Sequence, residues 1–172
     1  MTLPARRQSA WSASFAATAE EHLDDVYGYL VYLTRDRSLA EDLAAETFEK
    51  ALKHWRRFDP ARASARTWLC QIARTTALDW FRSEERRRRR EERAAPPERV
   101  DVTLAEGLSP ELEAALASLS AGEREVIALR VLLELDGDEA ARVLGVSPTA
   151  VSTRLSRALK KLEERMDSHV AV

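Results

Sequence analysis

The chain has 172 residues, of which 45% are hydrophobic and 33% charged, with only five glycines and six prolines. This balance is typical of a helix-rich globular protein with one ordinary domain or two small ones. A single cysteine excludes an internal disulfide and argues against a cysteine-based zinc site, so we expect a reducing, cytoplasmic setting. The three histidines form no ligand spacing and no apolar run approaches a membrane span, so we expect neither a metal or other cofactor nor membrane insertion.

The net charge of −2 is unevenly distributed along the chain. Residues 1–95 carry 18 basic and 15 acidic groups, residues 96–141 carry 3 and 11, and residues 142–165 carry 6 and 2. Two basic zones therefore flank an acidic middle. A uniform surface would not give this pattern, which indicates different partners for different segments.

The first half predicts two helices after a frayed leader over residues 1–19, in which Trp11 and Phe15 are candidates to dock onto the first domain. Apolar residues at helical spacing predict a helix over residues 20–34. Ser38 followed by Glu41 predicts a capping box that begins a second helix, which ends before Pro60. The opposite side of this helix is charged and should face solvent; its residues are Asp42, Glu46, Glu49, Lys50 and Lys53.

A long third helix follows a loop over residues 58–64 and runs from about residue 65 into the run Arg86–Arg90. Its apolar stripe is Trp68, Leu69, Ile72 and Ala73, whereas Arg66, Arg74 and Arg82 recur every eight residues and can share a cationic side. The arginine run is consistent with a solvated helix end or with a nucleic-acid contact, and the sequence leaves both open.

The stretch Ala94-Ala95-Pro96-Pro97 marks a domain boundary. Residues 94–108 hold few large apolar groups and should form a linker without a hydrophobic core of its own. Ser109 and Pro110 restart helical structure, and Ser120 with Glu123 gives another capping box before a buried helix over residues 123–134.

Residues 137–162 are predicted to form a helix-turn-helix. Gly145 supplies a left-handed residue that ends its first helix, Ser147 caps the second, and Pro148 suits the first position of that helix. Val151, Leu155, Ala158, Leu159 and Leu162 should face inward. The opposite face is polar and cationic, as a helix in the DNA major groove requires, although an ordinary amphipathic helix also has such a face. Its residues are Thr149, Ser152, Thr153, Ser156, Arg157 and Lys160, with Arg154 at the edge.

With both halves in view, the sequence resembles the extracytoplasmic-function (ECF) class of bacterial RNA polymerase sigma factors. The resemblance rests on AEDLAAETFEKALKHW (40–55) and ARTWLCQIARTTALDWFR (65–82), followed by LASLSAGEREVIALRVLLEL (116–135) and AVSTRLSRALKKL (150–162). It implies an all-α fold of two small helical domains joined by a flexible linker. The expected parts are a leader (1–19), an N-terminal sigma domain (20–93), an acidic linker (94–108), a C-terminal sigma domain (109–166) and a tail (167–172).

The resemblance also implies a function: a subunit that binds core RNA polymerase, recognises the minus-thirty-five and minus-ten promoter elements and promotes DNA opening, without covalent chemistry of its own. Its implied partners are promoter DNA, the clamp coiled coil and flap of the polymerase, and an anti-sigma factor. The linker would thread the RNA exit channel, or act as a plain tether.

Site residues follow from the same resemblance. Polymerase binding is assigned to Glu41, Asp42, Glu46, Glu49 and Lys50. Minus-ten binding and melting are assigned to Arg62, Arg66, Trp68, Leu69, Arg74 and Arg82, with Trp68 equally consistent with a core residue. Minus-thirty-five binding is assigned to the polar face of the last helix: Thr149, Ser152, Thr153, Arg154, Ser156, Arg157 and Lys160.

The main alternative is a stand-alone helix-turn-helix repressor or activator whose first half senses a ligand or dimerises. That half shows an acidic helix and an arginine-rich extension rather than an evident pocket. An enzyme has almost no support, because the lone Cys70 lies on an expected core helix and is better explained as a small buried hydrophobe.

Overall fold

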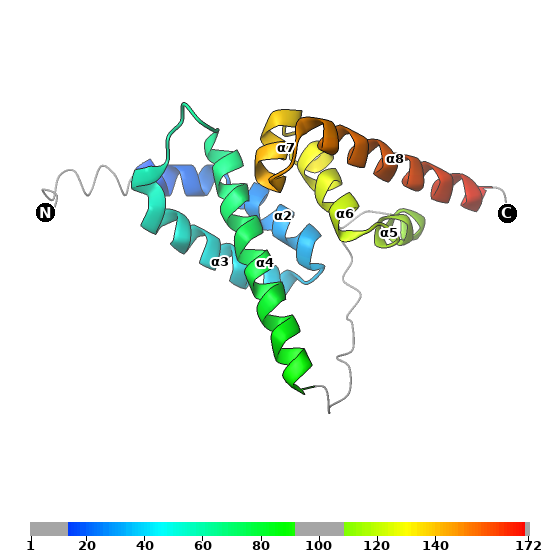
Figure 1. Cartoon of the computed structure of the whole chain (residues 1–172), viewed down its shortest axis with the longest axis horizontal. Coiled ribbons are helices and arrows are strands. Elements are labelled where there is room, and N and C mark those ends of the chain that lie inside the picture. The colour runs from blue at the N-terminus through cyan, green and yellow to red at the C-terminus, as the bar shows by residue number, and fades with distance from the viewer. Residues whose placement is uncertain (1–13, 92–108, 171–172) are drawn as a thin grey trace, which may run out of the picture.

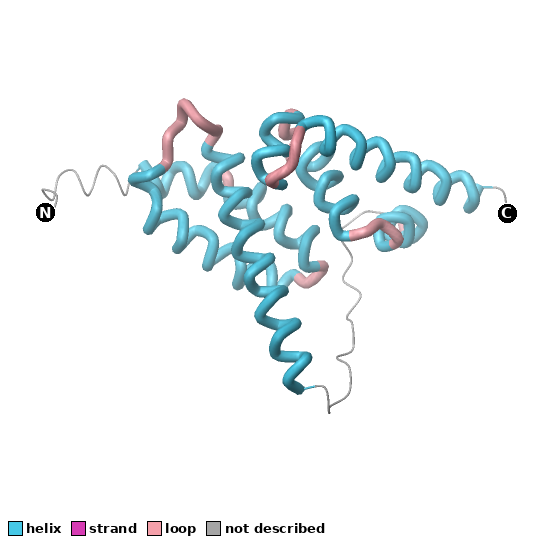
Figure 2. The backbone as a smooth tube through the Cα atoms, viewed as in Figure 1, coloured by secondary structure: helices cyan, strands magenta, loops and turns pink. Residues whose placement is uncertain are grey.

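The computed structural model describes residues 14–91 and 109–170, and every regular element within these two stretches is a helix (Figures 1 and 2). The first stretch holds a helix over residues 14–21, then α2 (Leu23–Thr34), α3 (Arg37–His54), the short η1 (Trp55–Arg57) and α4 (Ala65–Glu91). The second holds α5 (Pro110–Ala117), α6 (Ala121–Ile127), η2 (Ala128–Leu132), α7 (Gly137–Leu144) and α8 (Pro148–Val170). The expected linker (94–108) lies outside the described residues, whereas α8 continues through the expected tail as far as Val170.

The start of the chain differs from the expectation at two points. The chain is already helical at residue 14, within the expected leader, and Phe15 is buried as predicted, whereas Trp11 lies outside the described residues. The predicted capping box at Ser38 and Glu41 is wrong. Asp36 caps α3 instead, because its extended backbone lets its carboxylate accept the Leu39 amide at 3.0 Å.

An aromatic cluster closes the end of the N-terminal bundle beneath the loop at 58–64. Trp55 stacks on Phe58 with ring centroids 4.9 Å apart, and Trp68 lies 5.2 Å from Phe58 and 5.8 Å from Trp55. Phe15 meets Trp55 edge-on at 5.4 Å. Such pairs add to the stability gained from burying the rings, so this cluster fixes the start of α4 against the end of α3.

Helix α4 is the longest element, and its 27 residues span about 40 Å at the usual rise per residue. Its first half supplies core residues, among them Leu69, Cys70, Ala73 and Ala77, which are fully buried. Burial raises the pKa of the Cys70 thiol to about 12, as expected for a small buried hydrophobe. Its second half extends away from the bundle (Figure 1).

The C-terminal half confirms most of the predicted capping. Ser109 caps α5, and Ser120 forms a reciprocal capping box with Glu123 at the start of α6. Asp136 and Glu139 form a further capping box at the start of α7. The buried helix expected over residues 123–134 is α6 only to Ile127. It then widens into the π-helix η2, which turns Val131 and Leu132 outward.

The structure confirms the predicted turn between the two helices of the helix-turn-helix. Gly145 adopts a left-handed φ of 66° and ends α7, and the Ser147 hydroxyl accepts the Ala150 amide at 3.2 Å to begin α8 at Pro148. Val151 and Ala158 are buried, and Leu155 and Leu162 pack against the core. The expected burial of Leu159 is wrong: this side chain is 46% exposed and lines an open hollow between α8 and Arg130 of η2.

The two halves pack against each other. Helix α7 lies against α4, and α6 lies against α2, so that one apolar cluster runs through both halves (Figure 1). The sequence did not predict this arrangement.

Candidate nucleic-acid interface

The outer side of α3 carries an acidic surface. Glu41, Asp42, Glu46 and Glu49 are exposed there. Glu49 accepts a hydrogen bond from Lys53 at 2.6 Å, which lowers the pKa of the Glu49 carboxyl.

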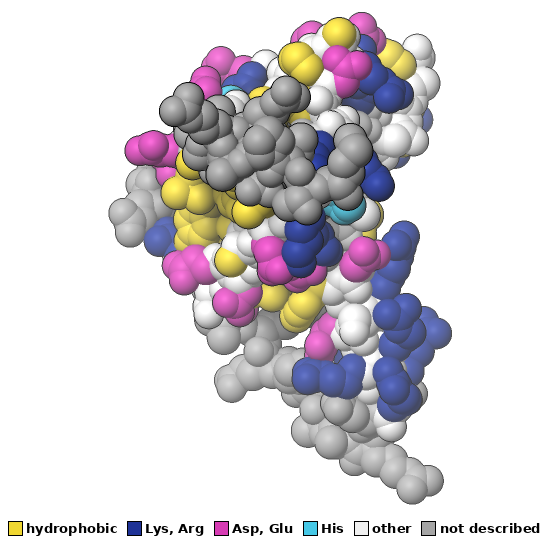
Figure 3. Space-filling view, turned by 90° about the vertical axis from the view of Figure 1, so that its left-hand side faces the viewer, with side chains coloured by type: hydrophobic (Ala, Val, Ile, Leu, Met, Phe, Trp, Pro, Cys, Tyr) yellow, Lys and Arg dark blue, Asp and Glu magenta, His cyan; other side chains and the backbone are white. Residues whose placement is uncertain are grey.

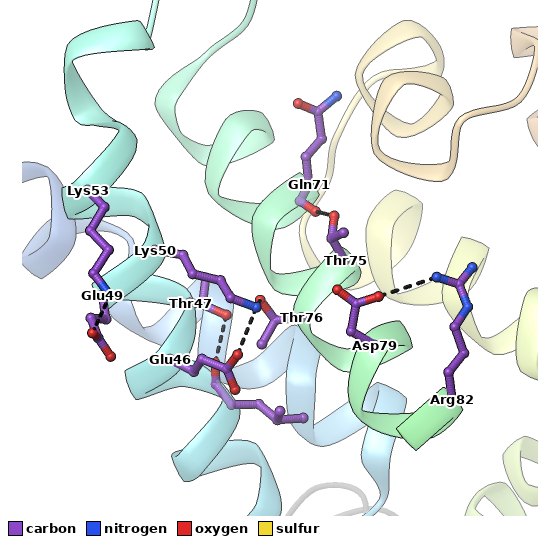
Figure 4. A network of polar contacts seen from close by, with 11 residues as sticks. Glu46, Thr47, Glu49, Lys50, Lys53, Gln71, Thr75, Thr76, Asp79 and Arg82 are labelled. Atoms are coloured by element: carbon purple, nitrogen blue, oxygen red, sulfur yellow. Dashed lines mark hydrogen bonds and ion pairs between the residues drawn. The ribbon is translucent and has the colours of Figure 1, made fainter. Parts of the chain in front are cut away.

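Lys50 belongs to the same helix but has a different environment. Its ammonium donates to the Thr76 hydroxyl of α4 at 3.2 Å and pairs with Glu46 at 2.7 Å, as Figure 4 shows. Lys50 therefore ties α3 to α4, whereas the carboxylates around it face solvent.

The first turns of α4 hold polar residues that are already engaged by the C-terminal half. The Ser64 and Thr67 hydroxyls each donate to Oε1 of Glu139 on α7, both at 2.9 Å. Gln71 donates from Nε2 to the carbonyl oxygen of Arg142 at 3.1 Å. One face of the beginning of α4 is thus covered by α7.

Arg74 lies one turn further along α4 and forms the most buried ion pair between the halves. Its Nε donates to Oε1 of Glu125 on α6 at 2.7 Å, and the Tyr29 hydroxyl donates to the same oxygen at 3.0 Å. Glu125 is 7% exposed and Tyr29 is 1% exposed. Burial first, and the Glu125 charge second, raise the pKa of the Tyr29 hydroxyl well above its usual value.

The remaining minus-ten candidates divide by exposure. Arg62 is exposed in the loop before α4, and Arg82 is exposed and lies 3.3 Å from Asp79. Arg66 is half-buried, 3.9 Å from Asp25 of α2, and Trp68 belongs to the aromatic cluster. Leu69 is fully buried, so its side chain does not reach the surface in this arrangement.

The end of α4 is strongly cationic. Arg87, Arg88 and Arg89 are more than half exposed and pair with Glu84 or Glu85 one turn earlier on the same helix. Five arginines against three glutamates over residues 84–91 leave this end of α4 positive, and Figure 3 shows Lys and Arg side chains gathered on this lower part of the molecule. Such a surface attracts phosphates without reading sequence.

The outward face of α8 presents the predicted set of short polar and basic side chains. All of its members are exposed except Arg154, which is half-buried. Four of them line a hollow of about 730 Å³ whose other wall is the start of α6: Thr149, Thr153, Arg154 and Arg157. Arg154 packs over Gly122, where an added Cβ would lie 3.6 Å from its guanidinium.

The packing of α8 depends on a residue that the sequence interpretation did not single out for this purpose. Lys161 of α8 pairs with Glu123 of α6 at 2.7 Å. This contact and the Ser120 amide lower the pKa of the Glu123 carboxyl to about 2. Helix α8 is thereby fixed to α6 beside the hollow that Arg154 and Arg157 line, since Glu123 is part of its wall.

Comparison with known proteins decides the family. The family model for sigma-70 region 2 matches residues 18–87, and the model for sigma-70 region 4 matches residues 109–162. The ECF RNA polymerase sigma factor SigX of Bacillus subtilis is 31% identical over 164 residues, which cover 90% of this chain and 84% of SigX. The chain belongs to the ECF class of sigma-70-type sigma factors.

Further relatives agree with this assignment. The ECF sigma factor SigC of Mycobacterium tuberculosis is 36% identical over 137 residues, covering 78% of this chain and 73% of SigC. The solved structure of CnrH in complex with the cytosolic domain of CnrY is 26% identical, with a TM-score of 0.67 and coverage of 91% and 90%. The sigma factor RpoE of Bartonella quintana, solved with the anti-sigma factor NepR, shares the fold at 24% identity and a TM-score of 0.74, with coverage of 90% and 97%.

As an ECF sigma factor, the protein gives RNA polymerase its promoter recognition and supports transcription initiation. A stand-alone repressor or activator is not favoured, because the first half matches sigma region 2 rather than a ligand-sensing domain. Among the residues that the structure describes, no helix is long and apolar enough to cross a bilayer, and no cluster of acidic, His and Cys side chains could hold a metal ion.

The sequence interpretation missed the residues that join the two regions. These are Tyr29, Ser64, Thr67 and Gln71 of region 2, and Glu125 and Glu139 of region 4. The excess of acidic groups over residues 96–141 beside a basic first half was a signal that these segments could pair, but the sequence did not show which side chains meet.

Proposed function

We propose that the three surfaces of this sigma factor divide promoter recognition between them. The observation that carries the proposal is the exposed polar face of α8, which follows directly from the Gly145 turn of the helix-turn-helix. In this assignment α8 enters the major groove of the minus-thirty-five element. Arg157 and Arg154 are suited to guanine edges, whereas Thr149, Ser152, Thr153, Ser156 and Lys160 contact bases or phosphates.

The minus-ten element is assigned to the loop at 58–64 and to α4. Extruding a base from the duplex costs a few kcal/mol in lost stacking and pairing, so the protein must supply both a pocket and backbone contacts. Arg62, Arg66, Arg74 and Arg82 would supply contacts to phosphates, and Trp68, at the edge of the aromatic cluster, would supply a stacking surface. Leu69 can take part only as support beneath Trp68, because its side chain is buried.

Core polymerase is assigned to the acidic face of α3. Glu41, Asp42, Glu46 and Glu49 are exposed and would meet a basic surface on the clamp coiled coil, while Lys50 keeps α3 fixed to α4. Region 4 would contact the flap. Residues 94–108 lie outside the described residues; their acidic composition favours a linker that threads the RNA exit channel.

The partner set and setting follow from this role. The protein would act in the cytoplasm, where core polymerase and promoter DNA are found, and would carry out no covalent chemistry itself. An anti-sigma factor is the expected inhibitor, in line with the NepR complex of the structurally similar RpoE.

The decisive experiment is run-off transcription with purified core polymerase on a promoter selected with the reconstituted holoenzyme. We expect initiation only when this sigma factor is added. Asp42→Lys should weaken core binding and abolish initiation, whereas Glu20→Lys, an equal charge reversal on an exposed residue outside the docking surface, should leave both intact. The proposal fails if the wild-type protein neither binds core enzyme nor directs initiation.

A further inference from the structure

The first helix, over residues 14–21, docks onto the bundle through one large side chain. Phe15 is the only buried residue of this stretch, and Ala19, one turn later, packs against the same core. The Phe15 ring meets Trp55 edge-on, with the ring centroids 5.4 Å apart. Figure 1 shows this helix, in dark blue, beside the end of α3 and near the loop at 58–64. The first helix is therefore attached at the aromatic cluster.

Trp55 connects Phe15 to the beginning of the loop. It stacks on Phe58, the first residue of the loop, at 4.9 Å, and Trp68 of α4 lies 5.2 Å from Phe58. The rings of Trp55, Phe58 and Trp68 are all half-buried, so each depends on its ring neighbours for its position. Without Phe15, the edge of Trp55 loses one of these neighbours, and the stack that holds Phe58 is weakened.

The backbone of the loop has a defined shape. Asp59 accepts the Ala61 amide through its carboxylate and the Arg62 amide through its carbonyl oxygen, both at 3.0 Å. At the other end, the Ser64 hydroxyl accepts the Thr67 amide at 3.2 Å, where α4 begins. These bonds shape the loop from within, whereas the stack on Phe58 fixes where the loop starts.

This loop is also the proposed site of minus-ten capture. A loop that must become ordered when it binds loses affinity, and a loop already fixed in its bound shape avoids that loss. Arg62, the proposed phosphate contact, lies in the loop, and Trp68, the proposed stacking surface, packs on its first residue. A side chain that fixes Phe58 would therefore act on DNA capture without touching DNA.

Phe15 lies outside the part of the chain that the sigma-70 region 2 model matches, which begins at residue 18. Trp55, Phe58 and Trp68 lie within that part. Membership of the family therefore assigns no role to Phe15, and its role follows from its contacts in this structure.

We propose that Phe15 is a positioning residue for promoter opening: through Trp55 and Phe58 it braces the loop at 58–64 in the shape that captures the extruded minus-ten base. The first helix then contributes to minus-ten recognition although it makes no contact with DNA. The inference rests on the proposed placement of the minus-ten element at this loop and on α4.

The first test measures the mobility of the loop in the full-length protein. A spin label is placed on a cysteine introduced at exposed Ala61; the native Cys70 is buried, and burial raises the pKa of its thiol, which keeps it unreactive. Phe15→Ala should sharpen the electron paramagnetic resonance lines, because the loop moves more freely. A label at exposed Ala114 of α5 should show no change. Identical Ala61 spectra with and without Phe15 overturn the proposal.

The second test uses holoenzyme reconstituted with purified core polymerase. Phe15→Ala should weaken the affinity for a single-stranded oligonucleotide carrying the non-template minus-ten sequence by about tenfold, within the range expected for loss of one base–aromatic stacking contact. Promoter opening should slow, while the affinity for core polymerase and the selection among minus-thirty-five sequences stay at wild-type values. A general loss of stability would lower all four properties together, and that result would overturn the positioning role.

The matched control is Leu23→Ala. It also shortens an apolar side chain near the start of the chain, but Leu23 is 49% exposed at the beginning of α2 and lies outside the aromatic cluster. This variant should behave as wild type in both tests. If it weakens minus-ten binding as much as Phe15→Ala does, the effect is not specific to Phe15 and the proposal is wrong.

A third test examines the route from Phe15 to the loop. Because Phe15 acts through Trp55, Phe15→Ala/Trp55→Ala should lose no more minus-ten affinity than Trp55→Ala alone. Losses that add in free energy would overturn the route.

Arg62→Ala separates failure of this inference from failure of the proposed function. If Arg62→Ala leaves minus-ten affinity and promoter opening unchanged, the placement of DNA at the loop is at fault. If it lowers both while Phe15→Ala lowers neither, the placement of DNA stands and the positioning role of Phe15 is wrong.

Discussion

The two helices proposed to bind promoter DNA, α4 and α8, differ in what their polar side chains touch. On α8 the hydrogen bond of Ser152 to the carbonyl of Pro148 at 3.2 Å and the 3.8 Å approach of Lys160 to Glu164 are local, whereas Arg154 packs over Gly122 of α6. On α4 the polar residues contact other elements, since Arg66 reaches α2, Arg74 reaches α6 and Thr67 reaches α7. The outward face of α8 is therefore open to solvent, whereas polar side chains of α4 are engaged by α2, α6 and α7.

The largest effect should come from substituting Leu69, a core residue of α4. The comparison is with Leu159, an exposed leucine of α8. Leu69→Ala should lower the free energy of unfolding by about 2 to 5 kcal/mol, because it removes a fully buried side chain. Leu159→Ala should cost well under half as much, since that leucine is 46% exposed on α8. Urea denaturation measures both, and equal costs would contradict the contrast between the two helices.

Arg157 tests whether the α8 surface reads bases. Arg157→Ala should reduce discrimination among minus-thirty-five sequences by about 1 to 3 kcal/mol, the usual value of a bidentate arginine–guanine contact. Binding to a set of minus-thirty-five sequences, measured at one salt concentration, gives this value. Lys160→Ala is the matched control, and should weaken binding to all sequences alike and reduce the salt dependence. Unchanged selectivity in Arg157→Ala would remove it from base readout.

Substituting Gly145 tests how much the left-handed turn before α8 contributes to the stability of the protein. Its φ of 66° disfavours any side chain, although an added Cβ would meet nothing within 4 Å. Gly145→Ala should therefore destabilise the protein by about 1 kcal/mol through backbone conformation alone. Gly28→Ala, in ordinary helical backbone of α2 and equally open space, should instead stabilise by about 0.5 to 1 kcal/mol. Thermal unfolding compares the pair, and effects of the same sign would refute the explanation.

The smallest effect concerns pH and the anchor of α8. The pKa of Glu123 is about 2 in the folded protein, below the ordinary value of about 4.3 for an unfolded chain. A lowered pKa means that the charged carboxylate stabilises the fold above the unfolded value, and that this contribution is lost as the pH falls from about 4.5 toward 2. Glu123→Gln should show a shallower loss of stability over that window. Denaturant titrations at several pH values measure the slope, and identical slopes would show that Lys161 does not anchor α8 in this way.

The features predicted correctly from sequence are those whose partners lie within a few residues. Ser109, Ser120 with Glu123, Ser147 and Gly145 act on backbone groups one turn away, so spacing alone identifies them. The cap of α3 was misplaced because Asp36 and Ser38 both precede the same apolar stripe, and only the extended backbone at Asp36 decides between them.

The remaining differences depend on elements distant in the chain. Leu159 continues the apolar pattern of α8, yet burial also needs an opposing surface that packs closely, and Leu159 instead lines an open hollow with Arg130. The chain widens into a π-helix at η2, and Val131 and Leu132 are exposed there, although both belong to the buried helix expected over residues 123–134. The contact of Arg74 with Glu125 joins residues 51 apart, so the sequence could assign Arg74 to a cationic side but not to its partner.

The length of α4 sets an order of events. The contacts with region 4 involve Thr67, Gln71 and Arg74 in the first half of this helix, whereas the arginine run lies at its other end, and both belong to one rigid rod of about 40 Å. The protein therefore presents its exposed arginines to solvent, where they would attract a DNA backbone over a Debye length of about 8 Å. If α4 binds promoter DNA as proposed, attraction of the backbone to this end can precede sequence reading, and the salt concentration should govern its speed.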